Sequence, residues 1–319
     1  MTIEKNAIKK IIVGFIASLL TLSSNARIVE LVLPFAPGGT ADELARIVLP
    51  VLKNELNKTG ITPVINFKPG GGTTIGTQAV AKTEPGKIQM LLISNSIVQA
   101  PIVNNLPGAY DLNKDFQVLG YLGHLPMIMA VSTATNIQNF KEFQTQCRQG
   151  KLSYGTGGIG TASHIVAAII SSHAGCDAPA GHYKGLGPMF ISLAGNHVNY
   201  GTGYLSGMKP LFDSNKLKPI LIFGRQRLPE YPDVPTIREV GIDVQLENWF
   251  IIAVNSTATL EDQKVFQQAV ANTLTSKEIQ DRLRELGFKN INAQVSTNFL
   301  AAEQNNFVRL IKNVNLDAR

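Results

Sequence analysis

Three glycine-rich turns are the features of this sequence whose residue types and spacing could do chemistry. They lie at residues 33–42, 68–76 and 154–164, and each follows a β-rich run and precedes a helical pattern that begins with a hydroxyl residue. Glycine lets the backbone approach a ligand closely, and a helix start offers free N–H donors with partial positive charge. A single turn of this kind is more often a tight connection in an α/β fold. Three of them predict an anion site at the carboxyl ends of the strands.

Other kinds of chemistry fit the same residues poorly. The third turn contains Gly155-x-Gly157-x-x-Gly160, but Asp177, at the distance where a dinucleotide site needs an acid after a strand, falls in a Gly/Pro/Ala-rich loop. Ser163 and His164 are adjacent, so on a helix they point about 100° apart and cannot form a proton relay. The five histidines and two cysteines lack metal-ligand spacing. We therefore expect no catalytic residue, no metal and no cofactor.

The amino terminus has the layout of a secretory signal peptide. Lys5, Lys9 and Lys10 precede an uncharged apolar run at 11–22, and small residues follow up to Ala26. The run is shorter than the roughly 20 residues that a membrane-spanning helix needs. We expect cleavage after Ala26, which makes residues 1–26 a signal peptide and places the mature protein in the periplasm.

Composition limits the partners and the architecture. The net charge of +6 comes from scattered basic residues that are not interleaved with aromatics, so nucleic-acid binding is not expected. A chain of 319 residues exceeds a single core, which predicts two lobes. In an oxidising compartment Cys147 and Cys176 could form a disulfide or remain two buried thiols, and the sequence leaves both open.

β-rich runs alternate with helical patterns, which predicts parallel sheets covered by helices. We expect strands at 28–33, 63–67, 90–94, 128–132, 152–154, 198–200 and 219–223. We expect a first helix at 41–56, kinked or shortened at Pro50, and three final helices at 260–274, 276–286 and 297–312. Capping boxes are predicted at three helix starts, namely Thr40 with Glu43, Thr236 with Glu239, and Thr275 with Glu278.

Five ordered motifs give the chain a resemblance to the Bug family, the extracytoplasmic substrate-binding receptors of tripartite tricarboxylate transporters. The motifs cover residues 34–42, 69–77, 154–164, 183–185 and 228–236. The resemblance implies a periplasmic binding protein-like fold with two α/β lobes, a cleft and crossing hinge strands. Lobe 1 would comprise residues 27–123 plus 225–319, and lobe 2 residues 124–224.

The resemblance also implies a function without a chemical step. The protein would capture a small organic carboxylate and pass it to the membrane subunits of a transporter, as a diffusing monomer. The ligand-binding positions carried over to this sequence are Phe35, Gly38, Gly39, Thr40, Ala41, Asp42, Ser94, Asn95, Gly157, Ile159, Gly160, Thr161, Ser163 and His164. Gly203 stands where the family often has an aspartate, which argues against a ligand with an ammonium group.

Two alternatives stay open at this stage. One is an exported sensor that presents its ligand-bound form to a two-component system. The other is an exported enzyme of small acids that uses Asp42 or His164 as a base, although no nucleophile, base and orienting group can be identified together.

Overall fold

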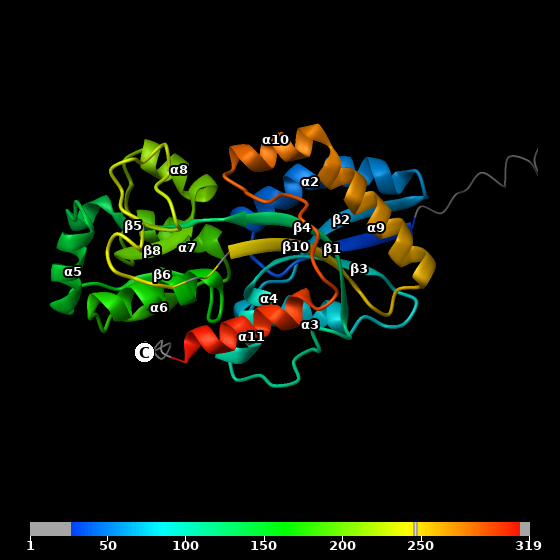
Figure 1. Ribbon diagram of the computed structural model, residues 1–319, viewed down its shortest axis with the longest axis horizontal. Coiled ribbons are helices and arrows are strands. Elements are labelled where there is room, and N and C mark those ends of the chain that lie inside the picture. Colours follow the sequence, from blue (N-terminus) through cyan, green and yellow to red (C-terminus); the bar gives the residue numbers. More distant parts are fainter. Residues whose placement is uncertain (1–26, 245, 247, 313–319) are drawn as a thin grey trace, which may run out of the picture.

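The computed structural model describes residues 27–244, 246 and 248–312. The predicted signal peptide, residues 1–26, lies outside the described residues. Figure 1 shows two bodies side by side, each a sheet with helices packed around it.

The first sheet has the strand order β2-β1-β3-β10-β4. Strand β1 is parallel to both β2 and β3, whereas β10 is antiparallel to β3 and β4. The strands are β1 (Arg27–Leu33), β2 (Ile61–Phe67), β3 (Gln89–Ser94), β4 (Phe116–Leu125) and β10 (Asn248–Asn255).

The second sheet has the order β7-β6-β8-β5-β9. Strand β6 is parallel to β7 and β8, and β5 is antiparallel to β8 and β9. The strands are β5 (Met127–Ser132), β6 (Tyr154–Thr156), β7 (Ala180–His182), β8 (Tyr200–Tyr204) and β9 (Leu217–Phe223). The expectation of parallel sheets is correct for four strands of each sheet, whereas β5 and β10 each run in the reverse direction.

Helices cover both sheets. Around the first sheet lie α2 (Thr40–Asn57), α3 (Thr74–Ala81), α4 (Ser96–Val103), α9 (Leu260–Thr275), α10 (Lys277–Glu285) and α11 (Phe299–Ile311). Around the second lie α5 (Phe140–Arg148), α6 (Ala162–Ala174), α7 (Leu186–Ala194) and α8 (Leu205–Asp213). Helix α2 buries Leu44, Val48 and Leu52 at the helical spacing that packs one face against the sheet.

The chain passes between the sheets at two places. Strand β4 ends at Leu125 and β5 begins at Met127, so a single residue, Pro126, separates a strand of one sheet from a strand of the other. The return runs from β9 to β10 through residues 224–247. These crossings follow the arrangement expected of hinge strands, and the lobe boundaries at 123/124 and 224/225 stay a prediction.

Local expectations fail at two helix starts. Residue Gly39, not Thr40, is the N-cap of α2, and Ser276, not Thr275, is the N-cap of α10, without a side-chain cap at either. Helix α2 is not shortened at Pro50, since it spans 18 residues from Thr40 to Asn57 with Pro50 inside it. The two capping-box predictions were wrong because Thr-x-x-Glu spacing does not determine which residue is the N-cap.

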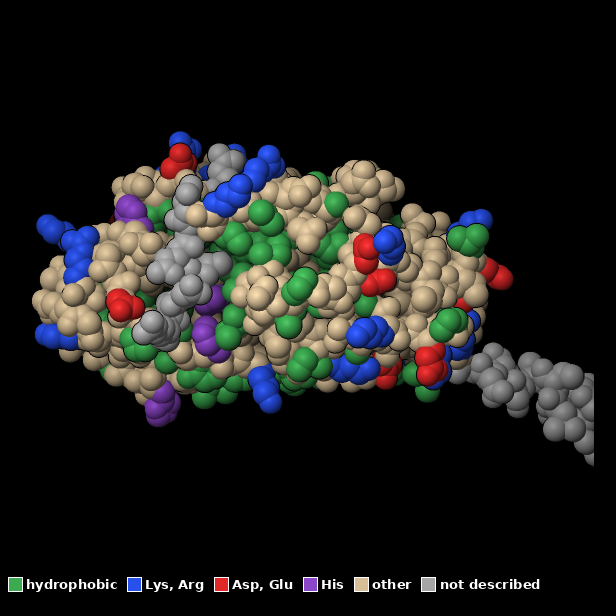
Figure 2. All heavy atoms as spheres, turned by 90° about the horizontal axis from the view of Figure 1, so that it is seen from below, with side chains coloured by type: hydrophobic (Ala, Val, Ile, Leu, Met, Phe, Trp, Pro, Cys, Tyr) green, Lys and Arg blue, Asp and Glu red, His purple; other side chains and the backbone are tan. Residues whose placement is uncertain are grey.

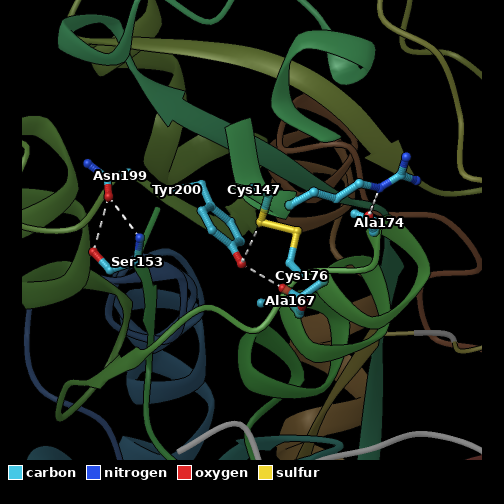
Figure 3. Close-up of a disulfide and its surroundings, with 9 residues drawn as sticks. Cys147, Ser153, Ala167, Ala174, Cys176, Asn199 and Tyr200 are labelled. Atoms are coloured by element: carbon cyan, nitrogen blue, oxygen red, sulfur yellow. Dashed lines mark hydrogen bonds between the residues drawn. A yellow bond between two sulfur atoms is a disulfide. The ribbon is translucent and has the colours of Figure 1, made fainter. Parts of the chain in front are cut away.

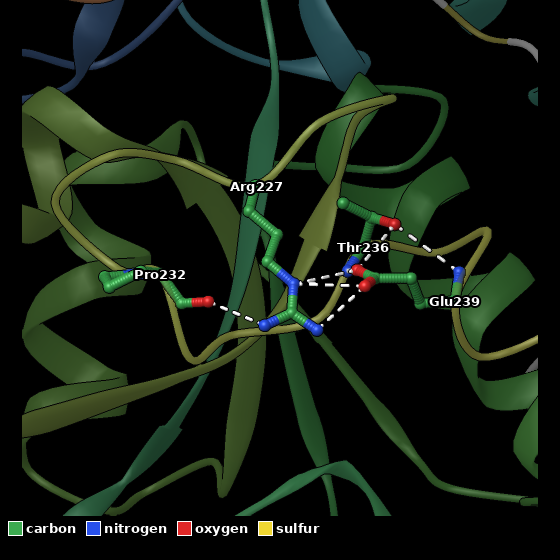
Figure 4. Close-up of polar contacts among 4 residues, drawn as sticks. All are labelled: Arg227, Pro232, Thr236 and Glu239. Atoms are coloured by element: carbon green, nitrogen blue, oxygen red, sulfur yellow. Dashed lines mark hydrogen bonds and ion pairs between the residues drawn. The ribbon is translucent and has the colours of Figure 1, made fainter.

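Arg227 contacts two other parts of the segment that returns to the first sheet (Figure 4). The Arg227 guanidinium pairs with the Glu239 carboxylate at 2.7 Å and donates to the Pro232 carbonyl at 2.6 Å. Glu239 also accepts from the N–H of Thr236 at 2.8 Å, the contact expected of a capping box, although the segment is a turn rather than one of the helices. These donors, Arg227 first, lower the pKa of Glu239 to about 2.

Cys147 and Cys176 form a disulfide (Figure 3), which settles the question that the sequence left open. The bond joins the last turn of α5 to the residue two positions after α6. Arg148 supports the same junction, because its Nε donates to the Ala174 carbonyl at 2.7 Å. Beneath it, the buried Tyr200 hydroxyl is hydrogen-bonded to Ser171 Oγ at 2.6 Å.

Candidate functional site

A small cavity lies where the two sheets face each other. It has a volume of about 30 Å³, room for roughly two water molecules. Its lining residues are Phe35, Gly39, Thr40, Ala41, Ser94, Met127, Gly157, Thr161, Ala162, Ser163, Gly185, Leu186, Tyr204 and Phe250. They come from both sheets, so the cavity is formed by the two bodies together.

The start of α2 forms one wall of the cavity. The first intrahelical hydrogen bond runs from the Glu43 N–H to the Gly39 carbonyl, so the earlier N–H groups of the helix have no partner within it. Two of these belong to Thr40 and Ala41, which line the cavity. The Thr40 hydroxyl is buried without a hydrogen-bond partner in the described structure. Such a group costs about 1–3 kcal/mol unless water or a ligand pairs with it.

Asp42 stabilises the turn before α2. Its carboxylate accepts from the Gly38 N–H at 2.9 Å and from Arg46 Nε at 2.7 Å. Both Asp42 and Gly38, which were predicted to contact a ligand, are thus engaged with each other and do not line the cavity. In this conformation the carboxylate shapes the turn, and the N–H groups that face the cavity come from the next residues along.

The start of α6 forms the opposite wall. Thr161 is the N-cap, and the first intrahelical hydrogen bond runs from the Ile165 N–H to its carbonyl. The N–H groups of Ala162 and Ser163 therefore have no partner within the helix. Ser163 Oγ accepts from the Gly157 N–H at 2.8 Å and lies 2.9 Å from Thr161 Oγ1. This hydroxyl network holds the third turn against the helix start.

His164 braces the same turn from behind the cavity. Its Nδ1 accepts from the Gly160 N–H at 3.2 Å, and its ring lies edge-on to His182 with centroids 5.1 Å apart. Burial, assisted by the nearby His182, lowers the pKa of His164 to about 4. The ring is therefore neutral near pH 7, as its acceptor role requires.

The structure brings eight of the fifteen predicted residues together around the cavity. These are Phe35, Gly39, Thr40, Ala41, Ser94, Gly157, Thr161 and Ser163. The other seven, which do not line it, are Gly38, Asp42, Asn95, Ile159, Gly160, His164 and Gly203.

Three of these outlying residues have other surroundings. Asn95 lines a different cavity beside Trp249. A side chain on Gly203 would meet the Phe190 ring at 2.6 Å, so this position packs against α7. Ile159 touches the second glycine turn, since a Cβ on Gly72 would lie 1.7 Å from the Ile159 carbonyl oxygen. The second turn is thus a contact between the two bodies.

Six lining residues were absent from the prediction: Met127, Ala162, Gly185, Leu186, Tyr204 and Phe250. One signal was available, because Tyr183-Lys184-Gly185 precedes α7 and repeats the pattern of strand, glycine and helix start. Gly185 is the N-cap of α7, with φ of 134°. A Cβ on the neighbouring Gly187 would lie 2.5 Å from the Pro37 carbonyl oxygen, so α7 begins against the first turn.

Residues 44–316 match the family described as tripartite tricarboxylate transporter family receptor. The chain belongs to this family. It is 26% identical over 231 residues to the protein BugT of Bordetella pertussis, covering 71% of this chain and 70% of BugT. The match confirms the resemblance inferred from the five motifs. Because the family consists of receptors, the alternative of an exported enzyme is set aside.

Solved structures agree with this assignment. The structure of the periplasmic binding protein BugD superimposes with a TM-score of 0.82 at 26% identity, covering 90% of this chain and 97% of BugD. An R. palustris protein solved with adipate gives a TM-score of 0.78 at 25% identity, covering 90% and 96%. The predicted fold of two α/β lobes of the periplasmic binding protein type is confirmed.

The structure bears on two further properties, metal binding and membrane insertion. Within residues 27–244, 246 and 248–312 there is no group of three or more His, Cys, Asp or Glu side chains placed to hold a metal ion. Over the same residues, no helix combines the length and apolar character needed to cross a membrane.

On the face shown in Figure 2, hydrophobic side chains gather in the middle, and most charged side chains lie nearer the edges.

Proposed function

We propose that this receptor captures a small organic carboxylate in the cavity between its two lobes. The carboxylate is bound by backbone N–H groups at the starts of α2 and α6, from Thr40 and Ala41 on one side and Ala162 and Ser163 on the other. The single observation that carries the proposal is that the starts of two helices, one packed on each sheet, line one cavity. Each contributes free donors and partial positive charge, which favour an anion.

Two further observations support an anion in this place. The Thr40 hydroxyl is buried without a partner and lines the cavity, so an oxygen of a ligand would satisfy it. The R. palustris relative was solved with adipate, a carboxylate. A cavity of about 30 Å³ has no room for an organic acid, so the lobes must part for the ligand to enter.

Closure around the ligand gives affinity without catalysis. As the lobes come together, water leaves the site, and each N–H to carboxylate hydrogen bond becomes stronger in the drier surroundings. The same closure makes the closed form a distinct surface that a partner can recognise. We propose that the partner is the membrane part of a tripartite tricarboxylate transporter, and that the protein reaches the periplasm through the signal peptide at 1–26 and acts there as a monomer.

The test replaces the N-cap of α2. Gly39 has ordinary backbone angles, so a side chain is not excluded by strain, but its Cβ would lie only 3.3 Å from the Gly187 nitrogen. Gly39→Asp places a negative charge at the proposed carboxylate site, and Gly39→Asn has nearly the same shape without the charge. Calorimetry with small organic acids should show at least about a hundredfold loss for the aspartate variant and a clearly smaller loss for the asparagine variant. Normal binding by Gly39→Asp would contradict the proposed site.

A further inference from the structure

Tyr204, at the end of β8, is a buried residue that lines the cavity. The residue is 2% exposed, and its hydroxyl has no hydrogen-bond partner among the described residues. Neighbouring Gly203 faces Phe190 on the α7 side, so Tyr204 points to the other face of the sheet. Thr202 shares that face and donates to the Ser163 carbonyl at 2.9 Å. Tyr204 therefore lies just beyond the start of α6, where it lines the cavity.

The ring of Tyr204 is held in place by the other lobe. It meets Phe250 of β10 edge-on, with ring centroids 5.6 Å apart. Burial raises the pKa of the Tyr204 hydroxyl, so the group stays protonated at neutral pH and can donate a hydrogen bond. A protonated hydroxyl on an immobilised ring is suited to recognise an acceptor oxygen at a fixed place.

Thr40 brings a second unpaired hydroxyl to the same cavity from the first lobe. No charged side chain lines the cavity in the part of the chain that the structure describes, and the rest of the lining is largely apolar. A ligand that leaves these hydroxyls without a partner would therefore bind at a cost, whereas a neutral oxygen on the ligand would remove that cost.

We infer that Tyr204 is a specificity-determining residue that selects acids carrying a hydroxyl or oxo oxygen in addition to the carboxylate. The inference rests on the proposed function, since the carboxylate at the two helix starts sets where the second oxygen lies. A site built to hydrogen-bond one oxygen rejects the analogue that lacks it more strongly than an apolar pocket rejects an added group. Tyr204 thus recognises the substituent oxygen, and the backbone N–H groups at the two helix starts bind the carboxylate.

Calorimetry with three matched pairs of acids tests the inference. The pairs are propionate with lactate, butyrate with 3-hydroxybutyrate, and succinate with malate, and each differs only by one hydroxyl. In the pairs that bind, the hydroxy acid should bind about tenfold more tightly to the natural protein. In Tyr204→Phe the two members should come within about twofold of each other, while circular dichroism shows an unchanged fold.

Tyr154→Phe is the matched control. Tyr154 also has a buried hydroxyl without a partner, but it packs against Tyr200 inside the second lobe and does not line the cavity. Its variant should keep the preference for the hydroxy acid. Equal binding of both members to the natural protein, or a preference that survives in Tyr204→Phe, would overturn the inference and leave carboxylate capture intact. If none of the six acids bound, carboxylate capture itself would be contradicted.

Discussion

The backbone N–H of Ala36 donates a hydrogen bond to the Lys184 carbonyl across 2.7 Å. This bond joins the turn after β1 to the turn before α7, and so it ties the first sheet to the second. A second bond between the lobes runs from Asn104 Nδ2 to the Ile159 carbonyl at 3.2 Å. Both bonds must break when the lobes part, which makes the closed form a state held by specific contacts as well as by a ligand.

The second glycine turn should control closure rather than ligand contact. In Gly72→Ala the new Cβ would overlap the Ile159 carbonyl oxygen at 1.7 Å, so the lobes could not close fully. We expect at least about a tenfold loss of affinity for the acid that binds best, from a cost of 1.4 kcal/mol or more. Calorimetry measures the affinity, and small-angle scattering should show a more open form with ligand present.

Gly86→Ala separates this effect from backbone strain. Gly86 also has positive φ, 82°, but a Cβ there meets nothing within 4 Å. Both variants should lose about 1–2 kcal/mol of unfolding free energy through the strain of positive φ. Gly86→Ala should nevertheless bind the acid with the affinity of the natural protein. Equal loss of affinity in both variants would mean that closure does not depend on Gly72.

Removing the disulfide should lower stability without changing ligand binding. The bridge closes a loop between cysteines 29 positions apart, and in the chain-entropy account this is worth about 3–4 kcal/mol. It lies at the far end of α6 from the cavity. Urea unfolding of Cys147→Ser/Cys176→Ser should show this loss of unfolding free energy, with the affinity for the acid within about twofold of the natural protein. A large fall in affinity together with unchanged stability would be the opposite of what the structure predicts.

The free energy of unfolding should decrease as the pH is lowered from 6.5 to about 4. The pKa of His164 is lowered in the folded protein from its ordinary value of 6.5 to about 4, chiefly by burial and then by His182. As the pH falls, the unfolded chain therefore takes up a proton first, and stability that is complete above pH 6.5 is lost toward pH 4. Burial also lowers the pKa of His182, which acts in the same direction.

Urea titrations across this range check the effect. Each histidine contributes a slope of up to about 1.4 kcal/mol per pH unit. His164→Asn, whose side chain can still accept from the Gly160 N–H, should flatten the profile. His197→Asn, at an exposed position, should leave it unchanged. A profile as steep in His164→Asn as in the natural protein would show that His164 is not the group responsible.

Short sequence patterns predicted the glycine turns and the helix ends, which depend on local backbone geometry. The glycine turns were placed correctly, and α2 begins one residue before its predicted first residue although its N-cap was not predicted, because glycine followed by an apolar periodic run determines where a helix can begin. The final helices α9, α10 and α11 begin and end within two residues of their predicted bounds.

Long-range features were not predictable from single segments. Strand β10 is buried on both faces and pairs with β3 and β4, which lie more than a hundred residues away in sequence. Its apolar run carries no local sign of that pairing. For the same reason Phe250 and Met127 were absent from the predicted site, and the inward turn of Asp42 toward Gly38 was not foreseen.

The most direct measurement is a crystal structure of the protein with the acid that binds it most tightly. The carboxylate should lie within about 3 Å of the backbone nitrogens at the starts of α2 and α6, those of Thr40 or Ala41 and of Ala162 or Ser163. An acid bound instead in the wider groove of about 690 Å³ beside Arg225 and Lys289, with those nitrogens unoccupied by the ligand, would contradict the account.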